Sequence, residues 1–370
     1  MTGESAGRNR DSWFRRNRVI FTLLAVGTLA LGYAIVVVTQ ALTRPAADSH
    51  AAPGAGPVDP TGADPSARTS AGPSARPTPS ARKGPTPSPT RRTGGGTAPP
   101  PSVSGFPNAN NTGVPAGTNL TNYTGSCTIT TNNVVIDAKT INCDVAIRAK
   151  GVVIKRSKIN GQLGTSEETP YSYTLQDSEV DAGVVQGAAV GSTNMTILRS
   201  DIRGGATSVY CYSNCTVRES WLHGQRLPAG ADWHLGAFLA NDDGLDPGGT
   251  TNAVLVHNTI HCDALPNSAD GGCSGNINLY GDFGPISHVT IDNNLFGANT
   301  GISYCVYGGE SSSKPYPNAD HVVIINNVFQ RGTNGKCGAF GPVSSFSTSR
   351  PGNQWTNNVW DNGAPVGPAN

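Results

Sequence analysis

The sequence predicts an all-β fold, a parallel β-solenoid of about nine to ten rungs behind an N-terminal transmembrane helix and a disordered linker. Three observations predict this organisation. An eight-residue pattern recurs along the last two-thirds of the 370-residue chain, an uncharged apolar stretch lies near the N-terminus, and a segment rich in Pro, Ala, Ser, Thr and Gly separates the two.

The repeat carries apolar residues at its third position, from Ile136 to Trp355, and at its eighth position, from Ile141 to Trp360. The copies show no helical period and are separated by Gly-rich turns, which predicts short strands. Self-similarity at intervals of roughly 20–40 residues indicates a solenoid whose rungs share one core. The copies lie at 134–141, 152–159, 173–180, 195–202, 215–222, 253–260, 289–296, 322–329 and 353–360.

The fifth and sixth positions of the repeat are polar. A tight inward bend leaves backbone groups that strand pairing does not satisfy, and stacked Ser or Asn side chains can bind them from rung to rung. The sixth position therefore predicts a buried ladder of Ser157, Ser178, Ser200, Ser220, Asn258, Asn294, Asn327 and Asn358. The fifth position predicts an exposed salt-bridge ladder of Arg156, Asp177, Arg199, Glu219 and His257.

Rung length divides the solenoid into two parts. Successive third positions lie 18 to 22 residues apart up to Val217 and 31 to 38 residues apart afterwards. The later rungs therefore carry long insertions. Because binding residues tend to lie on loops that a rigid scaffold holds, we expect the functional surface on the later rungs.

Composition limits the classes of partner. The formal net charge of +1 gives no electrostatic reason to bind nucleic acid. Residues 106–370 suffice for one large domain, the β-helix, which we expect to be a monomer. The 46 glycines in the chain suit a fold with many turns.

The N-terminal segments predict a membrane anchor. Residues 19–41 are mostly apolar and long enough to span a bilayer as a signal-anchor helix. Residues 1–18 are rich in Arg and are expected in the cytoplasm, which places the β-helix outside the cell membrane. The alternative is secretion after cleavage of a signal peptide, with Thr39, Gln40 and Ala41 as a small-x-small site.

Residues 42–105 predict a tether. Their composition cannot bury a core, and at about 3.1 Å per residue the segment would reach on the order of 190 Å. It could hold a domain within or beyond a cell wall. Its arginines either attract wall polyanions or are simply solvated.

The eight cysteines all lie in the β-helix domain. An even number of cysteines on the outer side of a membrane indicates disulfides. In a solenoid, residues that are close in sequence are also close in space. The simplest pairing is Cys127–Cys143, Cys211–Cys215, Cys262–Cys273 and Cys305–Cys337. A zinc site is the alternative, although the chain has no CxxC pair.

Three phrases and the Asn ladder resemble one protein family. The phrases lie at 105–117 (GFPNANNTGVPAG), 279–285 (LYGDFGP) and 350–360 (RPGNQWTNNVW). They resemble the actinobacterial-type right-handed parallel β-helix proteins of the pectate-lyase-like (pectin lyase fold) superfamily. The resemblance covers about residues 105 to 364 and implies a right-handed coil, in agreement with the crossover preference of parallel strands. This subgroup has no assigned reaction, so the resemblance implies a fold and no particular activity.

Catalytic motifs of better-understood superfamily members are incomplete here. Asn241, Asp242 and Asp243 resemble part of the polygalacturonase NTD and DD motifs, but the chain has no GHG and no RIK. Pectate lyases carry a WIDH-like calcium strand and an RxPxxR loop, of which 226–228 is a fragment. Neither mechanism can be transferred residue by residue.

The long rungs each contain a second predicted strand, at 235–240, 276–280, 303–307 and 336–340. Aligning them on the Gly or Asn that follows places Leu239, Leu279, Val306 and Ala339 in an inward column. Alternation then turns Ala240, Tyr280, Tyr307 and Phe340 outward, together with His234, Asn276, Asn278 and Lys336. We expect these side chains to form a saccharide groove or, alternatively, to pack under their own loops.

Two reactions fit such a groove. A β-eliminating lyase needs a base and a cation, for which His234 with Lys336 or Lys314 would serve. A glycoside hydrolase needs two carboxylates about 5–9.5 Å apart, and Asp243 and Asp282 begin insertions in neighbouring rungs. The expected substrate-binding residues are Asn278, Tyr280, Tyr307, Lys314 and Phe340. Calcium is a conceivable cofactor without a sequence motif of its own.

We therefore expect a protein that binds an acidic polysaccharide or cell-wall glycan, whether or not it cleaves it. The alternative is a non-catalytic surface protein that binds glycans or has a structural role. An ultraviolet-absorbing unsaturated product would indicate a lyase, new reducing ends would indicate a hydrolase, and retention without turnover would indicate a binder.

Overall fold

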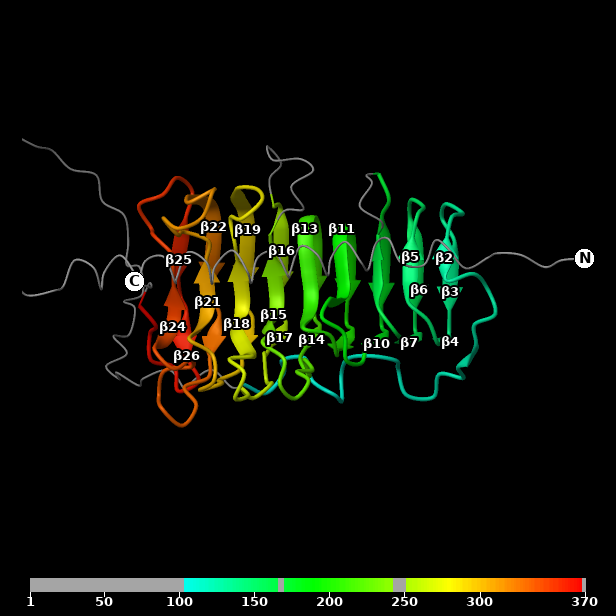
Figure 1. Ribbon diagram of the computed structural model, residues 1–370, viewed down its shortest axis with the longest axis horizontal. Helices are drawn as coiled ribbons and strands as arrows, with labels where there is room; N and C mark the ends of the chain where they lie inside the picture. Colours follow the sequence, from blue (N-terminus) through cyan, green and yellow to red (C-terminus); the bar gives the residue numbers. More distant parts are fainter. Residues whose placement is uncertain (1–102, 166–169, 242–250, 368–370) are drawn as a thin grey trace, which may run out of the picture. The chain divides into compact units, whose positions relative to one another are not determined.

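A computed structural model describes residues 103–165, 170–241 and 251–367. These residues form 26 strands and no helix, and the strands pair in parallel from one rung to the next. The strands lie side by side along the coil in sequence order (Figure 1). The predicted all-β solenoid is confirmed.

Each rung contributes to three stacks of strands. Stack A is the ten-stranded sheet of β1 (Thr121–Asn122), β4 (Lys139–Ile141), β7 (Lys158–Asn160), β10 (Glu179–Asp181), β12 (Asp201–Arg203), β14 (Trp221–Leu222), β17 (Thr259–Ile260), β20 (Leu295–Phe296), β23 (Val328–Phe329) and β26 (Val359–Trp360). Stacks B and C together form the sixteen-stranded sheet.

Stack B contains β2 (Thr128–Ile129), β5 (Val145–Ile147), β8 (Leu163–Thr165), β15 (His234–Ala240), β18 (Gly272–Leu279), β21 (Tyr304–Gly308) and β24 (Gly341–Ser344). Stack C contains β3 (Val135–Asp137), β6 (Val152–Lys155), β9 (Tyr173–Gln176), β16 (Ala253–Val256), β19 (Ile286–Asp292), β22 (Ala319–Ile325) and β25 (Gln354–Thr356). Two longer strands, β11 (Ala188–Leu198) and β13 (Thr207–Arg218), pair within both stacks.

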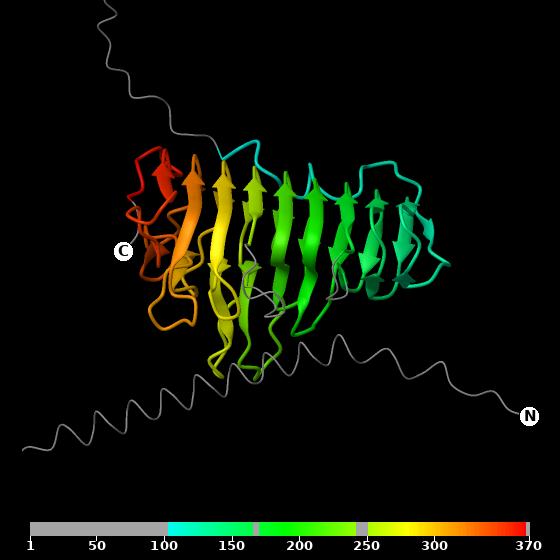
Figure 2. The same cartoon turned by 90° about the horizontal axis from the view of Figure 1, so that it is seen from above.

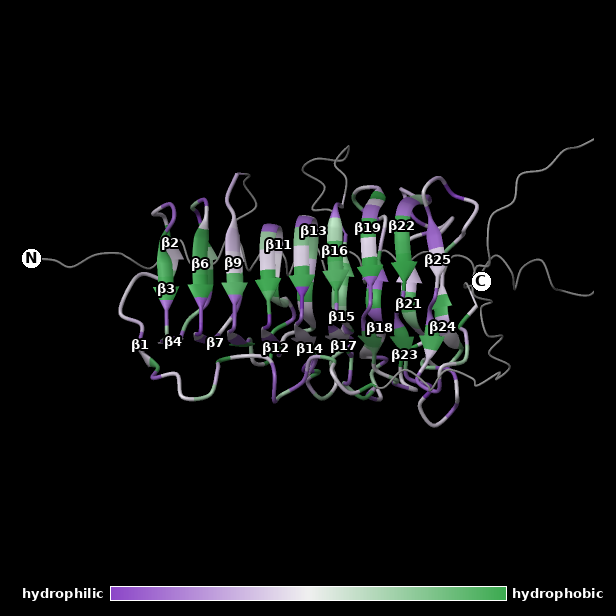
Figure 3. Cartoon of the chain, turned by 180° about the vertical axis from the view of Figure 1, so that it is seen from behind, coloured by the Kyte–Doolittle hydropathy of each residue, from purple (hydrophilic) through white to green (hydrophobic). Residues whose placement is uncertain are grey.

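The two apolar positions of the repeat form the core. The third position is buried in stack C from Ile136 to Ile324, and the eighth is buried in stack A from Ile141 to Phe329. Trp355 and Trp360 continue the columns at the last rung, where they are partly buried. Several strands of stack C are hydrophobic, and the turns that follow them are hydrophilic (Figure 3).

The predicted Ser and Asn ladder is confirmed. Each side-chain oxygen accepts a hydrogen bond from the backbone N–H of the equivalent residue one rung earlier, at 2.8 to 3.4 Å. Each Asn from Asn258 onward also donates to a backbone carbonyl oxygen of the stack C strand one rung earlier. The ladder thus satisfies buried backbone groups at the bend between stacks C and A.

The residue before the ladder has a left-handed backbone in every copy, with φ between 45° and 58°. Asn tolerates this conformation better than most residues, which accounts for Asn293, Asn326 and Asn357 in the later copies. The earlier copies carry the charged residues of the predicted salt-bridge ladder. Arg199 pairs with Asp177 at 2.6 Å as predicted, whereas Arg156 pairs with Asp137 of the fourth position at 2.6 Å.

An N-terminal arm, residues 103–120, crosses the rungs along stack A. Phe106 packs against Leu295 and Val328 of late rungs, and the N–H of Gly113 binds the carbonyl oxygen of Arg199 at 3.0 Å. The arm then reaches β1, which pairs with β4 in the first rungs. Figure 2 shows the arm, in cyan, running from the yellow strands to the cyan end of the coil. Phe106 therefore covers outward apolar side chains that solvent would otherwise reach.

All eight cysteines form the predicted disulfides, Cys127–Cys143, Cys211–Cys215, Cys262–Cys273 and Cys305–Cys337. Disulfides persist in oxidising compartments, so the domain fits an extracellular or secreted location.

Peptide mapping without reduction is expected to recover these four pairs, because each pair is already within bonding distance in the folded chain. The measurement is mass spectrometry of the purified chain after thiol blocking. Free thiols at Cys305 and Cys337, or a bridge between distant rungs, would show that the rung register is different.

Within the described ranges no helix is long and apolar enough to cross a membrane. The predicted signal-anchor, 19–41, lies outside those ranges, as do residues 1–18 and 42–102.

Candidate functional site

The late strands of stack B carry the predicted site, but their register differs from the predicted one. Ile277 pairs with Phe238 and Val306, and Val306 pairs with Val343. These four side chains are buried and form the inward column. The neighbouring column is Leu239, Asn278, Tyr307 and Ser344, so Tyr280 does not share a column with Tyr307. The predicted inward column of Leu239, Leu279, Val306 and Ala339 was wrong.

The segment predicted as a strand at 336–340 is a turn. Cys337 has a left-handed backbone, with φ of 68°, and its disulfide to Cys305 holds it against β21. Gly338 approaches the same strand so closely that a Cβ would lie 2.7 Å from the carbonyl oxygen of Ser303. The strand of this rung is β24 instead.

Four aromatic rings nevertheless gather here. They form an aromatic cluster of Tyr280, Tyr304, Tyr307 and Phe340, in which neighbouring ring centroids lie 5.8 to 6.0 Å apart. Phe340 is 69% exposed, while the three tyrosines are partly buried. Tyr304 links Phe340 to Tyr307 and was missing from the sequence prediction. Its position three residues before Tyr307, in the same predicted strand, was the available signal.

A cation lies at the buried end of the aromatic cluster. The Nζ atom of Lys314 lies 4.8 Å from the ring centroid of Tyr280 and 2.7 Å from Oδ1 of Asp282. The other carboxylate oxygen, Oδ2 of Asp282, accepts a hydrogen bond from Nδ2 of Asn241 at 3.1 Å. Each carboxylate oxygen of Asp282 therefore already has one partner.

The hydroxyls of Tyr280 and Tyr307 are neutral donors. Burial raises the pKa of Tyr280 far above its ordinary value, and burial also raises the pKa of Tyr307. The hydroxyl of Tyr280 donates to Oδ1 of Asn278 at 3.3 Å. Asn278 is only 3% exposed, so this amide supports Tyr280 from beneath the cluster.

The other predicted site residues lie at the margin or outside the described chain. His234 begins β15 and is exposed, and Lys336 is exposed in the turn that carries Phe340. No ion pair of either side chain is found within the described ranges. Asp243 lies outside the described residues, so its separation from Asp282 stays a prediction.

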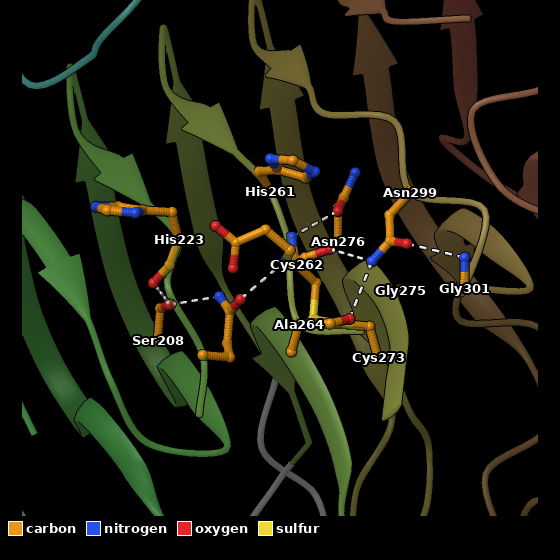
Figure 4. Close-up of a disulfide and its surroundings, with 12 residues drawn as sticks. Ser208, His223, His261, Cys262, Ala264, Cys273, Gly275, Asn276, Asn299 and Gly301 are labelled. Carbon is orange, nitrogen blue, oxygen red and sulfur yellow. Dashed lines mark hydrogen bonds between the residues drawn. A yellow bond between two sulfur atoms is a disulfide. The ribbon is translucent and has the colours of Figure 1, made fainter. Parts of the chain in front are cut away.

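Amide side chains brace the loop between β17 and β18 (Figure 4). Asn276 is fully buried, accepts from the N–H of Cys262 at 2.8 Å and donates to the carbonyl oxygen of Gly297 at 2.8 Å. Asn299 donates to the carbonyl oxygen of Cys262 at 2.8 Å. Asn276, predicted to face outward into the groove, therefore holds the base of a loop closed by the Cys262–Cys273 disulfide.

Two histidines appear in the same view, His261 at the first residue of this loop and His223 in the rung before it. His223 binds Oδ1 of Asp201 through Nε2 at 2.9 Å and stacks on Trp221 with ring centroids 3.4 Å apart. Burial lowers the pKa of His261, whose Nε2 lies 3.3 Å from the carbonyl oxygen of Ala298. Both rings are thus held by the outer side of stack A rather than by the aromatic cluster.

Comparisons with known proteins give little further information. No family model matches the chain, and no curated protein matches it. Among solved structures, a GH136 lacto-N-biosidase from Eubacterium ramulus matches with 10% identity and a TM-score of 0.16, over 61% of this chain and 51% of that chain. The chain thus spans about half the length of that enzyme, and a superposition of this quality carries no argument.

Proposed function

We propose that the aromatic cluster and the cations beside it bind an acidic polysaccharide. The observation that carries the proposal is the continuous path of four rings from exposed Phe340 to half-buried Tyr280. The apolar faces of sugar rings pack on aromatic rings, and contacts of this kind contribute roughly 0.5–1.5 kcal/mol each. A solvent-accessible row of rings at loop ends suits a chain of sugars better than a single compact ligand.

The charges beside the rings favour an acidic sugar. An ammonium group has three donors, and Asp282 occupies one donor of Lys314. The remaining donors and the exposed Lys336 can meet a uronate carboxylate. Asp282 is only 12% exposed and already paired, so it adds little repulsion toward an anionic ligand.

Truncation of the exposed ring is the test of this proposal. Phe340→Ala is expected to weaken binding to an acidic polysaccharide at least fivefold, because about 1 kcal/mol of stacking is lost. Adding Lys336→Ala should bring the loss to at least about tenfold and reduce the salt dependence of binding. The measurement is affinity electrophoresis of the purified chain against acidic and neutral polysaccharides.

The matched control is Val184→Ala, which removes an exposed apolar side chain, 57% exposed, from the short early rungs. It should leave binding unchanged. Equal binding by wild type and the Phe340→Ala Lys336→Ala variant, or a loss only on changing Arg199 and Glu219, would reject the aromatic cluster as the site.

Cleavage remains an extension of this proposal, with His234 as base and Lys336 or Lys314 as cation in a lyase, or Asp243 with Asp282 in a hydrolase. The same polysaccharide panel reports on it through ultraviolet-absorbing products or new reducing ends. His234→Ala should lower turnover at least about a hundredfold in a lyase that uses this base. Retention without either product would assign a purely binding or structural role.

The proposal places the domain outside the cell, in the compartment that its four disulfides require. Residues 19–41 would anchor it in the membrane and residues 42–105 would carry it into the wall. The coil would be right-handed, as its resemblance to the pectate-lyase-like superfamily and the crossover preference of parallel strands both imply.

A further inference from the structure

Two histidines stack at a bend where other rungs carry asparagine. His288 and His321 lie at the starts of β19 and β22 with parallel rings, the centroids 4.5 Å apart and the planes 4° apart. Both have left-handed backbones, with φ of 57° and 49°. The same bend in earlier rungs holds Asn194, Asn214 and Asn252, joined by side-chain hydrogen bonds of 2.8 and 3.1 Å.

The polar atoms around these histidines converge on one carboxylate. Nδ1 of His321 lies 2.9 Å from Oδ1 of Asp320, and the Ser287 hydroxyl donates to the same oxygen. Nδ1 of His288 lies 2.7 Å from the Ser287 hydroxyl oxygen. One ligand atom from each of His288, Asp320 and His321 lies within 4.8 Å of the other two. Asp320 and His321 are about half exposed, so ions can reach the cluster.

From this geometry we propose that His288, Asp320 and His321 form a binding site for a divalent cation of the zinc type, with Ser287 or water as the fourth ligand. Imidazole nitrogen and carboxylate oxygen are ligands that Zn²⁺ prefers, at bond lengths of about 2.0–2.2 Å. Ligand atoms in such a tetrahedron lie roughly 3.4 Å apart. The three ligand atoms lie up to 4.8 Å apart and the two imidazole planes are parallel, so on binding the exposed imidazole rings turn out of their stack to aim one nitrogen each at the cation, which replaces the shared protons.

A glycine in the next rung makes space for the His321 ring. The equivalent bend of the next rung carries Gly352, and a Cβ there would lie 2.4 Å from Cδ2 of His321. Ser287 and Asp320 are paired in register across β19 and β22, which fixes the spacing of the two rungs. The bound cation would join the ends of the loops that carry Asp282 and Lys314. It would therefore stiffen the wall beside the aromatic cluster without contacting a sugar.

Calorimetric titration of the untagged, purified chain with Zn²⁺ tests the site. One saturable zinc per chain is expected, and zinc at about one hundred times its Kd should raise Tm by roughly 5–10 °C. His288→Asn and His321→Asn should each weaken zinc binding at least about tenfold. Asn is the matched replacement because it occupies this left-handed bend in neighbouring rungs. The chain has no free cysteine to compete for the metal.

His234→Ala, which removes an exposed histidine elsewhere, should leave zinc binding unchanged. The visible spectrum of the Co²⁺-loaded wild type gives a readout that needs no variant, and intense tetrahedral bands without sulfur charge transfer are expected. Absence of saturable zinc binding up to about 1 mM, or equal affinity in the wild type and both Asn variants, would overturn the proposal and leave a polar bend only.

Discussion

Ile197→Asp is expected to prevent folding of the coil. Ile197 is fully buried in β11, in the column between Leu175 and Val217 of the adjacent rungs. The change removes a large apolar side chain, which alone costs about 2–5 kcal/mol, and buries a charge that nothing in the column can pair. Domains are stable by about 5–15 kcal/mol in total, so little or no stability would remain.

Thr196→Asp is the matched control for this prediction, because Thr196 precedes Ile197 in the same strand and is partly exposed. Its melting temperature should stay close to that of the wild type. Circular dichroism and thermal melting of the two variants provide the comparison. A cooperatively melting Ile197→Asp variant with wild-type stability would show that the strand faces are assigned the wrong way round.

Asn294→Ala is expected to destabilise the chain by about 2–6 kcal/mol. Asn294 is fully buried, its Oδ1 accepts from the N–H of Asn258 at 2.9 Å, and its Nδ2 donates to the carbonyl oxygen of Leu255 at 3.0 Å. Removing the side chain leaves two buried backbone groups unsatisfied, each at about 1–3 kcal/mol. Denaturant unfolding measures the difference in the free energy of unfolding.

Asn294→Ser should lose less stability than Asn294→Ala, because Ser fills the ladder in the early rungs with hydrogen bonds of 3.0 to 3.4 Å. Asn318→Ala removes an exposed amide and should change stability by no more than about 0.5 kcal/mol. If Asn294→Ala and Asn318→Ala unfolded at the same denaturant concentration, the ladder would contribute no net stability.

The core columns, the polar ladder and the disulfides could all be predicted because each depends on a pattern that the sequence repeats. Ile154 pairs with Leu175 and Ser178 binds Ser157, in each case at the same position of the next or the previous copy of the repeat. Cys262 pairs with Cys273, which is close to it in sequence. The left-handed bend before the ladder is equally regular, but it could not be predicted from the sequence. Arg156 and Glu219 occupy it in the early copies, and such residues rarely adopt positive φ.

The site was predicted less well because insertions break the repeat. Leu279 pairs with Ala240 on one side and with Gly308 on the other, so the Asn or Gly that follows each strand is not in register from rung to rung, and a count from it gave the wrong columns. The packing of Phe106 against Leu295 joins segments far apart in sequence, so it left no periodic signal. The cluster of Ser287, Asp320 and the two histidines was also invisible, because it depends on the exact stacking of two loops.

The most direct test of glycan binding at the aromatic cluster is a crystal structure of the chain with an acidic oligosaccharide that the polysaccharide panel identifies. We expect sugar rings stacked on Phe340 and Tyr304, with a carboxylate within hydrogen-bonding distance of Lys314 or Lys336. An oligosaccharide bound instead along the early rungs, against Arg199 and Glu219, with the aromatic cluster empty, would contradict this expectation.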